Sequence, residues 1–352
     1  MFYHIIISIG CNLSCKYCDK EEFGEPDEET YDYKVPCKIN YDLEKLKTFV
    51  KKEDYVTFYG GEPLLGMDDI RKIMDSVECQ GFMIQTNGLL LHELGAEYVN
   101  KFHTILVSID GDEKITDKYR GEGVHKKVID NVKLIKEQGF SGELIARMVI
   151  TSDSDVYVQV KWLLENGFDN IHWQLDAMFS DLEEMKWLEK YNADVVKLMD
   201  FWIDEMKNGK VLRLYPFLVV MDSILKNERS LLRCGSGHNN FTIVTNGKIA
   251  PCPIMSLMKK NYLGDIDMGY KKSFVNWRCL ACLDYDLCGG RCLYSNILYS
   301  DLESYEKLCN TIHLYLQALK ERSEIVKDLI SKKIISLDDF KHLKYNGVEV
   351  IP

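Results

Sequence analysis

The chain has 352 residues, of which 46% are hydrophobic and 28% charged, so it can bury a core and global disorder is excluded. Its formal net charge of −11 argues against nucleic acid or an anionic membrane as a partner. No apolar run approaches the ~20 residues of a membrane helix, and the residues before Cys11 contain no secretory signal. We therefore expect a cytoplasmic protein whose 12 cysteines are metal ligands or redox groups rather than disulfides.

Short apolar runs alternate with amphipathic stretches over the N-terminal part of the chain. Strands are predicted where β-branched and aromatic residues precede a loop, at Tyr3–Ile9, Tyr55–Tyr59, Phe82–Thr86, Thr104–Ile109, Leu144–Ile150 and Asn170–Leu175. Helices are predicted between them from the spacing of apolar residues, at Tyr41–Lys52, Asp68–Ser76, His92–Asn100, Lys126–Gln138 and Val156–Glu165. This alternation predicts a parallel sheet, either a barrel-like arrangement with fewer than eight units or an open doubly wound sheet. Chemistry is expected in the loops that follow the strands.

The character of the chain changes after a long helix predicted at Asp181–Asn208. The residues from Arg213 to Cys309 are expected to be rich in loops, with short strands such as Phe241–Val244, and to be held by metal rather than by a large core. A final amphipathic helix is predicted over Ile312–Lys333. We therefore expect a core domain at residues 1–208, a cysteine-rich domain at 209–311 and a helical tail at 312–352.

A first group of cysteines, Cys11, Cys15 and Cys18, directly follows the first predicted strand. Three thiolates this close together can hold a four-iron cluster while one iron keeps an open position for a chelating substrate. A structural zinc site would need a fourth ligand, and no His or further Cys lies nearby. The pattern therefore favours a 4Fe–4S cluster over zinc.

The sequence CNLSCKYC at residues 11–18 resembles the signature of radical S-adenosylmethionine (SAM) enzymes. Residues 60–63, GGEP, are similar to a second motif of that superfamily, and the loops after the third and fourth predicted strands also resemble it. By this resemblance the catalytic cluster would be held by Cys11, Cys15 and Cys18, and SAM would be bound by Tyr17, Gly60, Gly61, Glu62, Thr86, Asn87, Ser108 and Arg120.

The resemblance also implies a role for individual side chains. Gly60 and Gly61 would let the backbone approach the ligand, and Glu62 would pair with the SAM ammonium group. Ser108 and Arg120 would hold the SAM carboxylate, although an ion pair at the surface is an alternative for Arg120. The implied fold is a partial (β/α)6 TIM-like barrel, in which a 5′-deoxyadenosyl radical made from SAM takes a hydrogen atom from the substrate. A flavodoxin or ferredoxin would donate the electron.

A second group of cysteines resembles the SPASM extension of radical SAM enzymes, which implies two auxiliary 4Fe–4S clusters. A pair of zinc knuckles is the alternative. The inner cluster would be bound by Cys234, Cys252 and Cys292, and the outer one by Cys279, Cys282, Cys288 and Cys309. Many members of the family have a further Cys shortly before the position of Cys234, and this chain has none there. The inner cluster would then keep an open iron or take Cys37 or an acidic side chain as its fourth ligand, whereas Cys79 is expected to be a small packed side chain.

Three functions remain open from the sequence. The chain resembles a group of peptide-modifying radical SAM enzymes described from methanogens, which implies a peptide or protein substrate and a crosslink, thioether, epimer or backbone change as product. It also resembles anaerobic sulfatase-maturating enzymes, which make formylglycine, but those place an Asp base where this chain has Pro253. A non-enzymatic iron–sulfur electron carrier is the third possibility.

Overall fold

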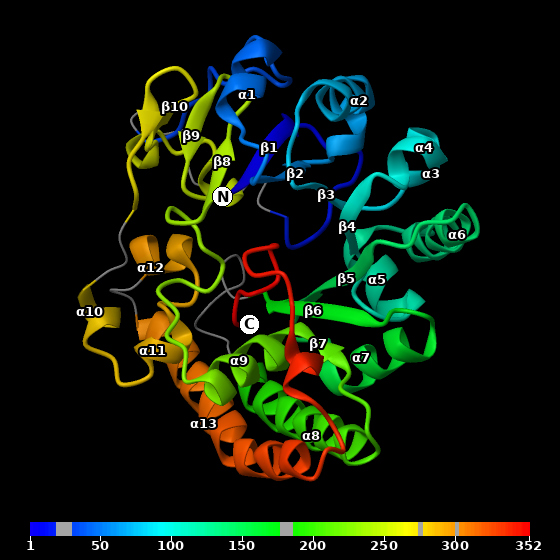
Figure 1. Cartoon of the computed structure of the whole chain (residues 1–352), viewed down its shortest axis with the longest axis vertical. Helices are drawn as coiled ribbons and strands as arrows, with labels where there is room; N and C mark the ends of the chain where they lie inside the picture. Colours follow the sequence, from blue (N-terminus) through cyan, green and yellow to red (C-terminus); the bar gives the residue numbers. More distant parts are fainter. Residues whose placement is uncertain (19–29, 177–185, 274–276, 300–302) are drawn as a thin grey trace. The chain divides into compact units, whose positions relative to one another are not determined.

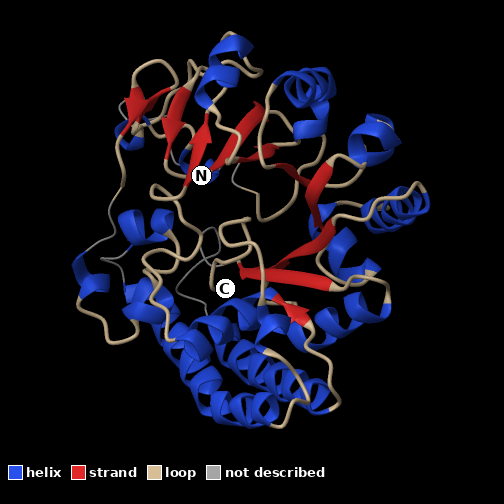
Figure 2. Cartoon of the chain, viewed as in Figure 1, coloured by secondary structure: helices blue, strands red, loops and turns tan. Residues whose placement is uncertain are grey.

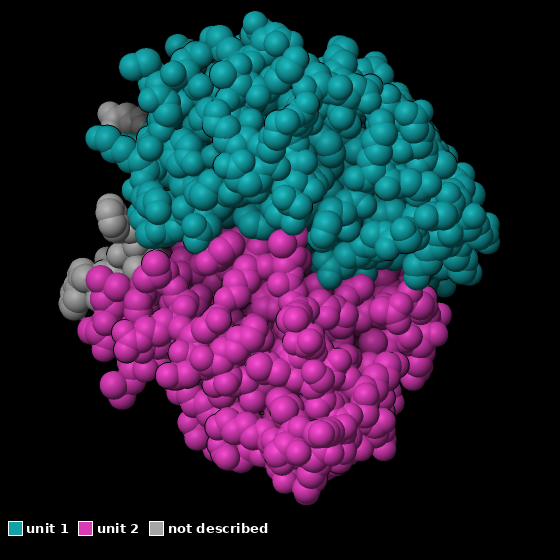
Figure 3. Space-filling view, viewed as in Figure 1, with its two compact units in different colours: residues 1–109, 113–145, 235–274 teal, residues 110–112, 146–234, 275–352 magenta. Residues whose placement is uncertain are grey.

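A computed structural model describes residues 1–18, 30–176, 186–273, 277–299 and 303–352. These residues form two compact units (Figure 3). The first contains residues 1–109, 113–145 and 235–274, and the second contains residues 110–112, 146–234 and 275–352. The start of the helix predicted at Asp181–Asn208 lies outside the described residues. The domain boundaries expected at residues 208 and 311 stay a prediction.

The described strands and helices alternate along most of the chain (Figures 1 and 2). The strands are β1 (Phe2–Ser8), β2 (Tyr55–Gly60), β3 (Gly81–Thr86), β4 (Phe102–Ser108), β5 (Glu143–Ile150), β6 (Asn170–Leu175), β7 (Arg213–Leu214), β8 (Asn240–Ile243), β9 (Lys248–Ala250), β10 (Gly264–Asp265) and β11 (Gly269–Tyr270). The α-helices are α1 (Leu43–Phe49), α2 (Met67–Ser76), α3 (Leu91–Leu94), α4 (Ala96–Val99), α5 (Glu113–Arg120), α6 (Val124–Glu137), α7 (Val156–Glu165), α8 (Trp187–Lys207), α9 (Tyr215–Lys226), α10 (Trp277–Leu280), α11 (Tyr285–Cys288), α12 (Leu293–Tyr299) and α13 (Glu303–Ser331). Short 3₁₀ helices are η1 (Pro63–Gly66), η3 (Pro253–Met255), η4 (Lys259–Asn261) and η5 (Leu337–Phe340).

The first unit is built on a mixed sheet with the strand order β11-β10-β9-β8-β1-β2-β3-β4. β1 to β4 are parallel to one another and β8 is parallel to β1, whereas β9, β10 and β11 run antiparallel to their neighbours. All seven residues of β1 are buried, as is typical of a parallel strand covered on both faces. The carboxyl ends of parallel strands meet at one edge of a sheet, so the loops after β1, β2 and β3 come together there.

The second unit packs helices against one face of a smaller group of strands. β6 and β7 pair in parallel, and Trp173 of β6 is fully buried against α8 and α9. Its Nε1 donates to the Tyr191 hydroxyl at 3.1 Å, and its ring meets that of Phe217 edge-on at 5.1 Å. These contacts place α8 and α9 on the face of β6 that carries Trp173.

The parallel α/β fold and all six strands predicted in the N-terminal part are confirmed, each to within two residues. Helix α9 contradicts the expectation that the chain is loop-rich beyond Arg213. Its first nine residues are all buried, so they show no polar face from which a helical period could be recognised. The helix predicted at His92–Asn100 is split into α3 and α4 at Gly95, whose φ of 90° interrupts a right-handed helix. In the part of the chain that the structure describes, no helix has the length and apolar character needed to span a membrane.

Candidate active site

The GGEP turn after β2 lies directly against the backbone that leads into Cys11. Gly61 N donates to Ser8 O at 2.9 Å, and Glu62 N donates to Gly10 O at 2.9 Å. A Cβ atom on Gly60 would lie 2.0 Å from Ser8 O, and one on Gly61 would lie 2.4 Å from Gly10 O. Glycine is therefore required at both positions because the chain's own backbone lies so close. The sequence had suggested that a ligand, rather than the backbone, makes this close approach.

The Glu62 carboxylate is fully buried and connects two loops. Its Oε1 accepts hydrogen bonds from Leu64 N at 2.9 Å and from Thr86 Oγ1 at 2.7 Å, and its Oε2 accepts one from Asn87 N at 2.7 Å. Burial raises the pKa of Glu62, and the hydrogen bonds from these three donors oppose that rise. Both oxygens thus already have protein partners, and the carboxylate holds the loop after β3 against η1.

The Asn87 side chain continues this connection to the first cysteine. Its Nδ2 donates to Asn12 Oδ1 at 2.7 Å and lies 3.9 Å from Cys11 Sγ. Leu13 N donates to the same sulfur at 3.4 Å. The loops after β1, β2 and β3 therefore form one hydrogen-bonded network that ends on Cys11. Asn12 was not predicted as a site residue, although it lies inside the CNLSCKYC motif.

The other end of the cysteine loop packs on the end of α5. Lys16 N donates to Tyr119 O at 2.9 Å, and the Tyr17 and Tyr119 rings stack with centroids 5.6 Å apart. The Arg120 guanidinium lies 5.4 Å from the centre of the Tyr17 ring. Arg120 is only 7% exposed, so the alternative of a surface position is wrong. Ser108 is the last residue of β4 and is partly exposed.

The donor set of this loop fits an iron–sulfur cluster. Cys11 and Cys15 are half-buried, Cys18 is exposed, and none of them is in a disulfide. Three soft thiol donors, one of which accepts a backbone hydrogen bond, suit iron–sulfur coordination, where such bonds tune the sulfur ligands. Within the described ranges, no three His, Cys, Asp or Glu side chains converge as they would on a single metal ion. The identity of the metal centre stays a prediction.

The four cysteines predicted to bind the outer cluster lie in the second unit. Cys279 and Cys288 lie on α10 and α11, Cys282 lies between these helices, and Cys309 lies on α13. Burial raises the pKa of Cys309 to about 12, with added repulsion from Cys288, Cys279 and Cys282. Burial, reinforced by Cys279, likewise raises the pKa of Cys288 to about 11. Thiolates at these positions would therefore repel one another, a cost that a bound cation would remove.

Two side chains beside these cysteines were missed from the sequence. The fully buried Asn296 donates from Nδ2 to Cys279 Sγ at 2.8 Å. His313 Nε2 lies 4.0 Å from Cys282 Sγ, while its Nδ1 bonds the Asp284 carboxylate. Helical spacing could have indicated His313, since it follows Cys309 by four residues and so shares its face of α13.

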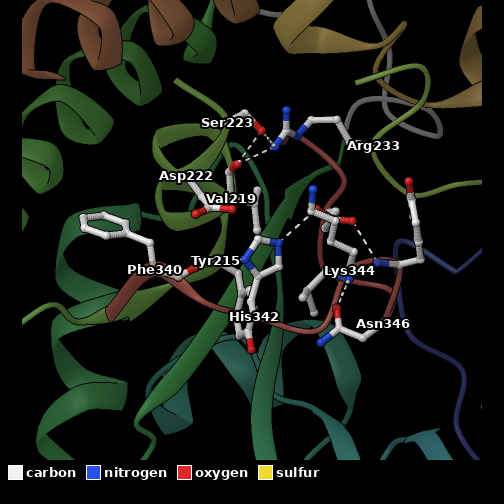
Figure 4. Close-up of polar contacts among 12 residues, drawn as sticks. Tyr215, Val219, Asp222, Ser223, Arg233, Phe340, His342, Lys344 and Asn346 are labelled. Atoms are coloured by element: carbon white, nitrogen blue, oxygen red, sulfur yellow. Dashed lines mark hydrogen bonds and ion pairs between the residues drawn. The ribbon is translucent and has the colours of Figure 1, made fainter. Parts of the chain in front are cut away.

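The remaining cysteines are divided between the units. Cys252 belongs to the first unit and Cys234 and Cys292 to the second, so the inner ligand set stays a prediction. Beside Cys234, Arg233 is fixed by donating from Nη1 to Leu287 O at 2.7 Å and from Nη2 to two acceptors of α9, as Figure 4 shows for Val219 and Ser223. Cys37 is exposed, and burial raises the pKa of the Cys79 thiol to about 11.

Comparison with known proteins gives a consistent picture. The model of the Radical SAM superfamily matches residues 5–160. A cysteine-type anaerobic sulfatase-maturating enzyme of Clostridium perfringens is 25% identical, with 89% of this chain and 92% of that protein covered. The radical SAM cyclopropyl synthase TigE of Paramaledivibacter caminithermalis is 22% identical, with 91% and 74% covered.

Solved structures show the same fold. The structure of anSMEcpe with bound AdoMet and Cp18Cys peptide superposes with a TM-score of 0.74 at 22% identity, covering 94% of this chain and 99% of that one. Streptococcus suis SuiB bound to its precursor peptide SuiA superposes with a TM-score of 0.52 at 17% identity, covering 83% and 71%. The likeness to the first extends over both units and therefore includes the cysteine-rich C-terminal region.

Proposed function

Residues 5–160 match the model of the Radical SAM superfamily, and from that premise we propose that this enzyme modifies a peptide after its synthesis. The observation that carries the proposal is the hydrogen-bonded network that joins Glu62, Asn87 and Cys11 at the carboxyl edge of β1, β2 and β3. Ligand sites of parallel α/β folds lie at this edge. The network supports a cluster and a SAM site built from these three loops.

The chain's residues have separable roles in this proposal. Cys11, Cys15 and Cys18 hold a 4Fe–4S cluster, while Asn87 and the N–H of Leu13 donate toward the Cys11 sulfur. A cluster held there would supply one electron to bound SAM, whose C5′–S bond would break to give methionine and a 5′-deoxyadenosyl radical that takes a hydrogen atom from the substrate. Arg120 and Ser108 would bind the SAM carboxylate. The Arg120 guanidinium lies over the Tyr17 ring.

A peptide substrate is supported by the ligands of the similar proteins. The solved anSMEcpe carries a Cp18Cys peptide, and SuiB carries a precursor peptide. Two auxiliary 4Fe–4S clusters and an electron donor such as flavodoxin or ferredoxin belong to the same proposal. The half-buried cysteines Cys288 and Cys309 and the N–H donor of Asn296 on Cys279 support the outer of these clusters.

Formylglycine formation is a second candidate because the sulfatase-maturating relative covers most of the chain. Pro253 argues against it. This residue opens η3 directly after the buried Cys252 and has no side-chain group that can accept a proton. The peptide maturase is therefore preferred, with the crosslink, thioether, epimer or backbone change left to experiment.

The test is mass spectrometry of peptides co-expressed anaerobically with the enzyme, taken from short reading frames beside its gene. We expect a defined mass change in one such peptide, together with 5′-deoxyadenosine from SAM cleavage by the purified enzyme. A synthetic sulfatase peptide containing the target cysteine serves as the matched probe. An aldehyde formed on that peptide would favour the second candidate, and absence of SAM cleavage would contradict both.

A further inference from the structure

Residues 342–352 form a largely buried segment of the second unit, and two of its own side chains contact each other. His342 Nε2 and Glu349 Oε1 are 3.0 Å apart, and their side chains are 1% and 6% exposed. Tyr345 N donates to Glu349 Oε2 at 2.8 Å, and Val348 and Ile351 are fully buried. Figure 4 shows His342 and Lys344 on this segment, next to Tyr215 of α9. The segment is thus seated among the packed elements of the unit.

The segment lies on a polar face of β5 and β6. Side chains alternate between the two faces of a strand, so His172 and Gln174 point away from the helices that cover Trp173. Arg147 of β5 joins them, donating from Nη2 to Gln174 Oε1 at 2.8 Å. Its Nη1 lies 3.0 Å from His172 Nδ1. In Figure 1 the red C-terminal segment runs beside β6, on the side opposite α8.

Three side chains of the unit bind this segment through its backbone carbonyls. Arg147 Nη1 donates to Gly347 O at 2.8 Å, and Arg291 Nε donates to Pro352 O at 3.3 Å. His172 Nε2 lies 3.1 Å from Val350 O. Because the His172 Nδ1 faces a guanidinium donor, its proton must be on Nε2, which then donates to Val350 O. Burial and the neighbouring Arg147 lower the pKa of His172, which keeps this neutral form.

We propose that residues 344–352 occupy the site at which this unit binds a peptide, and that the substrate peptide takes their place. This inference rests on the proposed function. Donors that contact main-chain carbonyls can bind peptides of different side-chain sequence, because every residue carries a backbone carbonyl. The His342–Glu349 contact lies within the segment and does not bind it to the rest of the unit. The donors on Arg147, His172 and Arg291 would be available to a competing peptide that offers the same carbonyls.

The test uses a fluorescein-labelled nonapeptide with the sequence of residues 344–352 and the anaerobically reconstituted enzyme. Its binding is measured by fluorescence anisotropy to the full chain, to a variant lacking residues 344–352, and to Glu349→Gln. The full-length Glu349→Gln variant weakens the contacts that Glu349 makes with His342 and Tyr345 N, and so loosens the fold of the segment, without removing buried side chains. It therefore covers the case that the deletion does not fold. Glu324→Ala, an exposed residue of α13, is the matched control.

We expect the nonapeptide to bind both loosened variants at least tenfold more tightly than the full chain or the control. Arg147→Gln, introduced into either loosened variant, should weaken that binding about tenfold, and hydrogen exchange should show protection of β5 and β6 by the peptide. Equal binding to all chains, or protection elsewhere, overturns the inference. A chain that cleaves SAM but fails this test retains its proposed function and loses only the assignment of residues 344–352.

Discussion

Replacing Glu62 by glutamine should destabilise the first unit while leaving its cysteine loop in place. The amide oxygen can still accept from Leu64 N and Thr86 Oγ1, but the amide nitrogen would face the N–H of Asn87. A buried donor without an acceptor costs about 1–3 kcal/mol, and we expect a loss of that size in the free energy of unfolding. Glu62→Ala removes the acceptor of all three donors and should cost about 3 kcal/mol or more.

The contribution of Glu62 to the free energy of unfolding should also depend on pH. Burial raises the folded-state pKa of Glu62 above its ordinary value of 4.5, so the folded state binds this proton more tightly than the unfolded state. The contribution of this group to the free energy of unfolding is therefore largest at low pH and is lost as the pH rises through the folded pKa. The wild type should show this component in the pH interval above 4.5, and Glu62→Gln should lack it.

Urea unfolding followed by circular dichroism over a pH series measures both effects, with Glu97→Gln at an exposed position as the control. Identical unfolding midpoints for the wild type, Glu62→Gln and the control would refute the role of Glu62 in holding the loop after β3 against η1.

Calorimetry of SAM binding separates this structural role of Glu62 from a direct contact with the ligand. If Glu62 also pairs with the SAM ammonium, Glu62→Ala should weaken SAM binding by about 1.5–3 kcal/mol with the first cluster retained, and unchanged affinity would exclude that contact.

Three further predictions address the metal centres and the fold. The reconstituted chain should carry about twelve iron atoms. Changing Cys11, Cys15 and Cys18 together to Ala should remove about four of these iron atoms and abolish SAM cleavage. Bound zinc without iron would contradict the assignment of iron–sulfur clusters. Asn296→Leu removes the N–H donor to the Cys279 sulfur and should lower the reduction potential of the outer cluster in an EPR-monitored titration. Asp155→Ala removes the side-chain cap of α7 and should lower the free energy of unfolding by about 0.5–2 kcal/mol, whereas Asp155→Asn should retain most of it.

The strand pattern was readable from the sequence because a buried parallel strand is a short apolar run that ends in a loop. β6 was predicted with its observed bounds, Asn170–Leu175. The cysteine loop and the GGEP turn were also visible, since both are short local patterns. Helix α9 was not, because its buried residues carry no amphipathic signal.

The partners of the site residues could not be predicted. Glu62 and Asn87 are far apart in the sequence, and their hydrogen bond exists only because β2 and β3 pair in parallel. For Asn296 the sequence predicts at most a position in a helix. Its contact with Cys279 depends on how α10 and α12 are arranged in the unit. Local motifs thus indicated which residues matter, whereas their roles followed from contacts between separate elements.

If Cys309 binds the proposed outer cluster, helix α13 would link cofactor supply to the survival of the chain. It is 29 residues long, about 43 Å, with Cys309 near its beginning and its later turns packed on α8 and α9. Without iron, its first turns would carry the protonated thiol of Cys309 close to the protonated thiols of α10 and α11, while the rest of the helix stayed in the core. We expect iron starvation to leave the polypeptide partly frayed at this end and open to cellular proteases, so that iron would govern how long the enzyme persists as well as whether it works.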